Sequence, residues 1–117
     1  MHIQDLTAKS EKASQLLSLM ANPHRLGILC ALHSGEHSVT ALEAIVDLSQ
    51  SALSQHLAKL REARIVTTRR KAQTIYYSIS DQRAERLLAV MHDLFCVQSK
   101  ATAARRLVKA RRSPGKR

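Results

Sequence analysis

The pattern that most constrains the fold lies in residues 48–61. Leu53, Leu57 and Leu60 recur four and three positions apart, which places them along one side of a helix. Ser49 precedes these leucines and is expected to cap the first turn. The pattern predicts a helix that buries its leucine face in a core and leaves the other side exposed.

The exposed side of this helix is rich in small polar groups. It carries Gln50, Ser51, Ser54, Gln55, His56 and Lys59. Gln can pair with adenine through two hydrogen bonds, Ser can donate or accept, and Lys can reach guanine or phosphate. The first four listed residues are candidates for base contact, and the last two for phosphate contact. A plain polar surface is the alternative interpretation.

Three further helices are predicted before this one, over residues 10–20, 24–32 and 39–46. Pro23 suits the first turn of the second helix, and Ser38 or Thr40 lies near the start of the third. The residues expected to face inward are Leu26, Leu29, Cys30, Leu42, Ile45 and Val46. A short helix followed closely by one with a polar outer face is typical of a helix-turn-helix.

After residue 63 the pattern changes to β-branched runs. Residues 65–69 and 74–79 predict a hairpin joined by a turn over residues 70–73. Arg69, Arg70 and Lys71 are expected at its tip, where they could hold phosphates or enter a minor groove. A basic hairpin beside a helix-turn-helix is a wing.

Asp81 is expected to cap a final helix with a broad apolar stripe. The stripe consists of Leu87, Leu88, Met91, Leu94 and Phe95. It is wide for one small core, and the first helix is also apolar on one side, so we expect a homodimer through the terminal helices. The expected organisation is a flexible segment 1–9, a winged-helix domain 10–97, and a basic tail 98–117, disordered or a frayed helix.

Charge and composition favour a polyanionic partner. The chain has 19 Lys and Arg against nine Asp and Glu, and residues 101–117 hold seven of these basic residues and no acidic ones. No apolar run is long enough to span a membrane and no secretory signal is recognisable, so a cytoplasmic protein is expected. No phosphate-binding loop, nucleophile motif or carboxylate pair indicates an enzyme or a cofactor.

Cys30 and Cys96 lie 66 positions apart without a CxxC motif. In a reducing compartment both are expected to be free thiols, and the commonest role of such residues is that of small buried apolar groups.

Three stretches together resemble the ArsR/SmtB family of winged helix-turn-helix repressors. They are MANPHRL at 20–26, LSQSALSQHL at 48–57 and AQTIYY at 72–77. The resemblance covers roughly residues 10–97 and is strongest to the NolR, HlyU, BigR and SqrR-like group. It implies a mainly α homodimer of α-α-α-α-β-β-α subunits that binds double-stranded DNA at an imperfect inverted repeat and blocks transcription.

The resemblance also bears on sensing. The Cys-x-Cys metal motif of the family is absent from the matching residues 42–48, and His92 and Asp93 are too few for its second metal site, so no metal is expected. Cys30 and Cys96 resemble the redox pair of the BigR, SqrR and HlyU branch, in which persulfide or oxidant links two thiols and DNA is released. The alternatives are a constitutive NolR-like regulator with inert cysteines, a metal-responsive repressor and a protein-interaction module.

Overall fold

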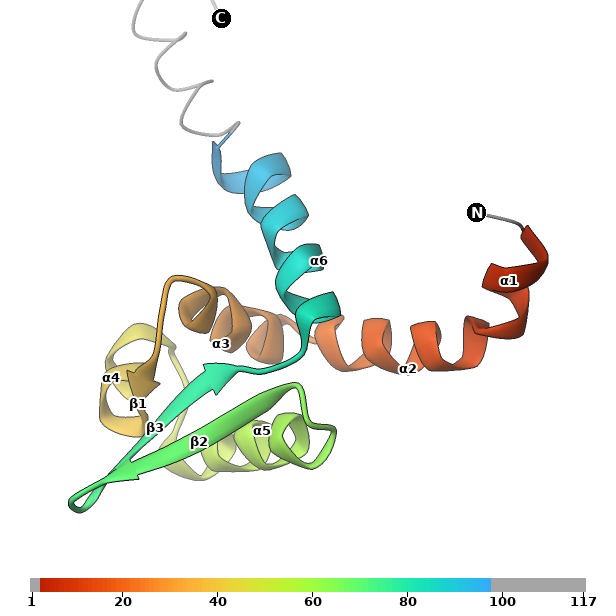
Figure 1. The fold of residues 1–117 in the computed structure, drawn as a ribbon. Coiled ribbons are helices and arrows are strands. Elements are labelled where there is room, and N and C mark those ends of the chain that lie inside the picture. Colours follow the sequence, from red (N-terminus) through yellow and green to blue (C-terminus); the bar gives the residue numbers. More distant parts are fainter. Residues whose placement is uncertain (1–2, 98–117) are drawn as a thin grey trace, which may run out of the picture.

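The computed structural model describes residues 3–97 as a mainly helical domain with a small antiparallel sheet (Figure 1). In chain order the elements are α1 (Ile3–Ala8), α2 (Ser10–Met20), α3 (Pro23–His33), β1 (His37–Ser38), α4 (Val39–Ile45), α5 (Gln50–Glu62), β2 (Val66–Lys71), β3 (Thr74–Ile79), α6 (Gln82–His92) and a π-helical turn η1 (Asp93–Val97). The predicted elements are present. Helix α1, strand β1 and the π-helical turn were not predicted, and the tail 98–117 lies outside the described residues.

Side-chain caps fix where the helices begin. The Asn22 side-chain oxygen accepts hydrogen bonds from the backbone N–H groups of His24 and Arg25 at the start of α3. Ser38, Ser49 and Asp81 accept equivalent bonds at the starts of α4, α5 and α6. The caps at Ser38, Ser49 and Asp81 were predicted, and the cap at Asn22 was not. Each cap satisfies backbone donors that the helix itself leaves unpaired.

The core is built from residues of α2, α3, α4, α5, α6 and strand β2, with α5 packed against α3 and β2. Leu53, Leu57 and Leu60 are all buried, as predicted. The other buried apolar residues are Leu16, Met20, Ile28, Leu29, Leu32, Leu42, Ile65, Val66, Ala84 and Leu88. Two residues that were predicted to face inward do not. Cys30 is exposed, because the buried face of α3 consists of Ile28, Leu29 and Leu32. Ile45 is 55% exposed at the end of α4.

The sheet has three antiparallel strands in the order β1-β3-β2. Lys71 pairs with Thr74 and Arg70 with Ile75, so only Ala72 and Gln73 form the turn. The basic residues therefore occupy the end of β2 rather than the tip, which corrects the prediction. The pairing extends two residues beyond the β-branched run because exposed Arg and Lys side chains are compatible with an edge strand.

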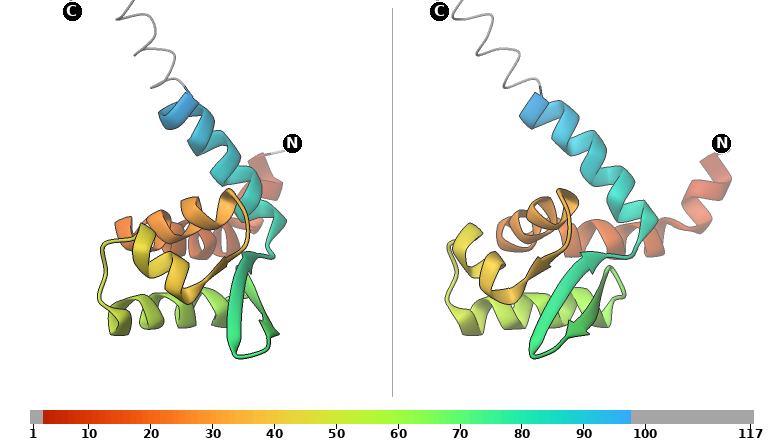
Figure 2. Two further views of the ribbon diagram at one scale, coloured as in Figure 1. Left: turned by 90° about the vertical axis from the view of Figure 1, so that its left-hand side faces the viewer. Right: turned by 60° about the vertical axis from the view of Figure 1, so that its left-hand side comes forward.

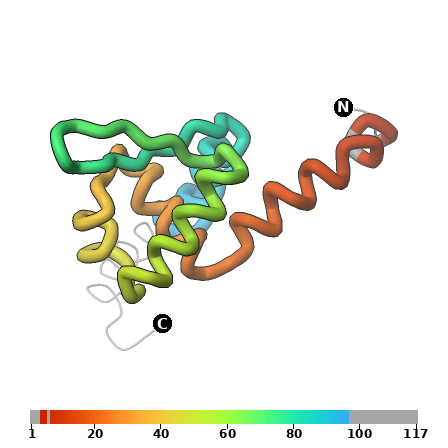
Figure 3. The backbone as a smooth tube through the Cα atoms, turned by 90° about the horizontal axis from the view of Figure 1, so that it is seen from below, coloured from red at the N-terminus to blue at the C-terminus, as the bar shows by residue number. Residues whose placement is uncertain are grey.

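The terminal helices extend away from this core. Figures 1 and 3 show α2 running away from the sheet, and α6 rising on the side of the domain opposite α5. Exposed apolar side chains lie on both: Leu17 on α2, Val90 on α6, and Leu94 and Phe95 in the following turn. None of the helices within residues 3–97 is long and apolar enough to cross a membrane.

Helix α5 ends in a Schellman motif. The Ile65 N–H donates to the Leu60 carbonyl and the Arg64 N–H to the Arg61 carbonyl, each at 3.0 Å, with Arg64 at φ +62°. This left-handed conformation is unfavourable for a side chain.

Arg64→Gly is therefore expected to raise the free energy of unfolding by up to about 1 kcal/mol, since relief of the Cβ clash exceeds the added entropy of the unfolded chain. Urea denaturation measures this change. Arg86→Gly, inside α6, should instead lower stability by about 1 kcal/mol; a loss of stability in both variants would contradict the prediction.

Candidate nucleic-acid interface

Helix α5 presents a polar face on the side opposite the core. Its Ser49 cap and buried leucines orient the helix, so that Gln50, Ser51, Ser54, Gln55 and Lys59 are all exposed. Figure 2 shows α5 along one edge of the domain, with the β2–β3 hairpin beside it. The predicted base-contact residues thus lie on one accessible surface, where their amides and hydroxyls can meet base edges.

His56 lies on a different side of the helix. Its ring centroid is 5.7 Å from that of His24 at the start of α3, and its Nδ1 is enclosed without a hydrogen-bond partner. Burial lowers the pKa of His56, and the neighbouring Arg25, His24 and Lys59 lower it further. A neutral, half-buried imidazole is poorly suited to hold a phosphate, so the structure does not favour this predicted contact.

Arg69 in the wing is held by a carboxylate. Its Nε and Nη2 donate to the two Glu36 carboxylate oxygens at 2.8 Å each, and its guanidinium lies 4.7 Å from the centre of the Tyr76 ring. The hydrogen bonds from Arg69 lower the pKa of Glu36. Arg70 and Lys71 are exposed and form no ion pair within residues 3–97. These two basic residues are more available to DNA than Arg69.

Glu36→Gln tests whether this ion pair withholds Arg69 from DNA. Freed from the carboxylate, Arg69 is expected to neutralise one more phosphate, which would tighten DNA binding and steepen the dependence of log K on log salt by about 0.9. Fluorescence anisotropy across a salt series measures this slope. Glu43→Gln removes an exposed carboxylate from α4 without freeing Arg69; equal slopes for the two variants would contradict the prediction.

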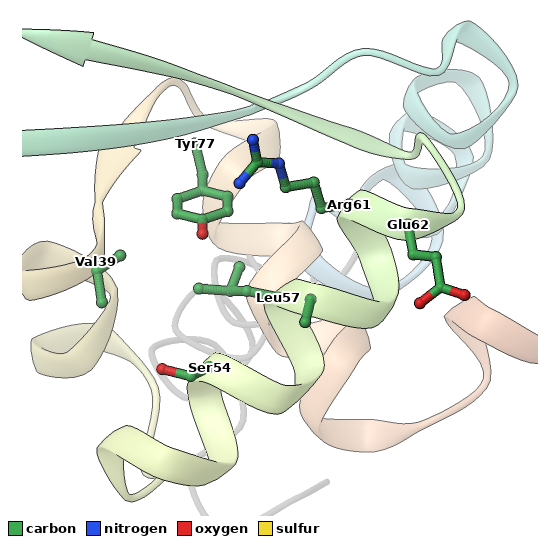
Figure 4. Close-up of a pocket in the computed structure, with 7 residues that line it drawn as sticks. Val39, Ser54, Leu57, Arg61, Glu62 and Tyr77 are labelled. Atoms are coloured by element: carbon green, nitrogen blue, oxygen red, sulfur yellow. The ribbon is translucent and has the colours of Figure 1, made fainter.

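A hollow of about 460 Å³ separates the outer flank of α5 from strand β3 (Figure 4). Val39, Ser54, Leu57, Ala58, Arg61, Glu62 and Tyr77 line it. Arg61 and Tyr77 were not among the predicted site residues. Arg61 lies two helical turns after Ser54, so helical spacing alone could have placed it on the same flank.

The two cysteines lie outside the polar face of α5. Cys30 on α3 and Cys96 after α6 are both free and exposed. Partial burial raises the pKa of the Cys30 thiol, and the nearby Cys96 raises it further. Between α3 and α6, His33 Nδ1 lies 3.4 Å from Glu85 Oε1, and the His33 and His92 rings are 6.2 Å apart. Within residues 3–97 no three His, Cys, Asp or Glu side chains are arranged to hold a metal ion.

A helix-turn-helix of α4 and α5, with a basic hairpin beside its polar helix, defines the chain as a winged helix-turn-helix protein. The profile described as "Bacterial regulatory protein, arsR family" matches residues 22–68. The transcriptional activator HlyU of Vibrio cholerae is 46% identical over 82% of this chain and 89% of its own length. The nodulation protein NolR of Rhizobium meliloti is 48% identical over 86% of this chain and 82% of its own length. The chain belongs to the ArsR family.

Solved structures agree with this assignment. The transcriptional repressor BigR from Xylella fastidiosa superposes with a TM-score of 0.77 at 35% identity, covering 82% of this chain and 98% of BigR. Reduced HlyU from Vibrio cholerae gives a TM-score of 0.76 at 46% identity, covering 80% and 99%. The chain is a DNA-binding transcriptional regulator; HlyU is described as a transcriptional activator and BigR as a transcriptional repressor. The resemblance drawn from the three sequence stretches is thus confirmed.

Proposed function

We propose that this regulator is a homodimeric repressor that releases an inverted-repeat operator when Cys30 and Cys96 are oxidised by persulfide or another oxidant. The observation that carries the proposal is that Cys96, after α6, lies near enough to Cys30 on α3 to raise the pKa of the Cys30 thiol, and that helices α3 and α6 pack against each other. Similarity to the repressor BigR supports repression, and the existence of a structure of reduced HlyU supports a redox-sensitive regulator.

The dimer is supported by the exposed apolar side chains of the terminal helices. In a dimer, the two copies would bury Leu17 and Val90 and place two α5 helices on one duplex. A two-fold symmetric dimer of this kind matches a DNA site that is an inverted repeat. Selection of bound sequences from a random DNA library should return an inverted repeat, and sedimentation should give twice the chain mass. If the selected sequences contain only single half-sites and the protein sediments as a monomer, this part of the proposal is refuted.

The redox step links the two sulfurs. Two Cys thiols and one persulfide RSSH yield a Cys–Cys disulfide, RSH and H₂S; the two electrons lost by the cysteine sulfurs cleave the S–S bond of the persulfide. Because its raised pKa keeps Cys30 largely protonated at neutral pH, the reaction should accelerate as pH rises. A bond between helix α3 and the turn after α6 would constrain the helices that set the spacing of the two α5 copies.

Mass spectrometry tests the link directly. Trypsin should release Cys30 in residues 26–59 and Cys96 in residues 87–100, and treatment with inorganic polysulfide should join these peptides through a reducible bond. Cys30→Ser should abolish the joined species. Two free thiols after treatment of the wild type would refute the redox proposal and favour the second candidate, a constitutive regulator with inert cysteines, which the 48% identity to NolR supports.

A further inference from the structure

The hollow between α5 and strand β3 lies between the two elements expected to contact DNA. Its lining joins the flank of the recognition helix, through Ser54 and Arg61, to the sheet, through Tyr77. Figure 4 shows the Arg61 guanidinium and the Tyr77 ring beside each other above Leu57. A duplex in contact with both the helix and the wing would pass its sugar-phosphate backbone across this position.

Arg61 is an exposed cation on the flank of α5. Within residues 3–97 its side chain forms no hydrogen bond or ion pair, whereas Arg69 is paired with Glu36 and Arg83 with Asp81. The Tyr77 hydroxyl likewise has no hydrogen-bond partner in this part of the chain. Both groups are therefore free to donate to an external acceptor.

One carboxylate borders the hollow. Glu62 is adjacent to Arg61 in sequence, but Figure 4 shows its carboxylate directed away from both Arg61 and Tyr77. The position is consequently occupied by donors: a guanidinium, a phenol hydroxyl and, two helical turns earlier, the Ser54 hydroxyl. This set matches the acceptor oxygens of a phosphate, which Arg can bind through two parallel hydrogen bonds.

We propose that Arg61 and Tyr77 hold a phosphate of the DNA backbone between the recognition helix and the wing. This assignment rests on the DNA-binding function and adds a contact that fixes the helix in the major groove without reading sequence.

The test compares Arg61→Gln and Tyr77→Phe with Arg86→Gln, which removes an exposed arginine from α6. Affinity for one operator duplex is measured by anisotropy across a salt series, after thermal unfolding has shown that each variant is folded. Arg61→Gln should reduce the slope of log K against log salt by about 0.9. Tyr77→Phe should weaken binding by about 3- to 10-fold without changing the slope, and Arg86→Gln should change neither.

If the unmutated protein binds the operator and Arg61→Gln has the same salt dependence of log K, the phosphate assignment is overturned while the proposed function stands. Wild-type protein that binds no duplex would instead overturn the proposed function. Calorimetric titration with inorganic phosphate distinguishes a site for a DNA phosphate from a site for a small free anion. For a DNA-backbone contact, we expect no saturable binding of inorganic phosphate at millimolar concentration. Saturable binding that is lost in Arg61→Gln would overturn the assignment to the DNA backbone.

Discussion

Replacing Gln55 with alanine is expected to weaken operator binding by about 5- to 150-fold, the effect of losing one two-hydrogen-bond contact to a base. Gln55 is exposed near the centre of the outer face of α5, whereas the adjacent His56 is turned toward α3. Because a base contact carries sequence information, affinity for a scrambled duplex should remain nearly unchanged. Anisotropy with the two duplexes measures both effects.

Gln82→Ala is the matched control for this variant. Gln82 is an exposed glutamine in the first turn of α6, on an element that does not contribute to the polar face of α5. Its replacement should leave both affinities at the wild-type level. A parallel loss for the operator and the scrambled duplex in Gln55→Ala would show that Gln55 contacts the backbone, which would contradict its assigned role.

The largest loss of stability is expected from Leu57→Ala. Leu57 is 1% exposed and lies between two other buried leucines of α5, so truncation removes packed apolar volume and leaves a cavity. The expected cost is about 2–5 kcal/mol of unfolding free energy, a large share of the total for a domain of this size. Urea denaturation at a fixed protein concentration measures the change.

Lys59→Ala provides the comparison on the same helix. Lys59 is exposed, so its truncation should change the free energy of unfolding by no more than about 0.5 kcal/mol. A cost below about 1 kcal/mol for Leu57→Ala would mean that the leucine face of α5 does not anchor the core.

Sequence patterns over one or two helical turns predicted helices α2 to α6 and most of their caps, because these features depend on interactions between residues close in the chain. The leucine stripe of α5 and the caps at Ser49 and Asp81 follow from residues within one or two helical turns. Cys30 was misplaced because helical spacing does not distinguish the core face from a flank when a small apolar residue lies at its edge. Strand β1 has only two residues, too few to show any periodicity.

The unpredicted features of the site join distant residues. Glu36 pairs with Arg69 across 33 positions, and Arg61 approaches Tyr77 across 16. Neither pair produces a sequence pattern, because each forms only when the sheet packs beside α5. The turn of the wing was placed two residues too early for a similar reason: strand length here is set by pairing with β3, not by the β-branched run of β2.

The most direct test of the proposed regulation measures the affinity of the reduced protein for its operator duplex, then that of the same sample after polysulfide treatment. Oxidation is expected to raise the Kd by about 5- to 150-fold, the usual range of coupling between two sites, and dithiothreitol should restore it. Cys30→Ser should keep the reduced affinity throughout. Equal Kd values for reduced and treated wild type, with the Cys30–Cys96 link present in the treated sample, would contradict the account.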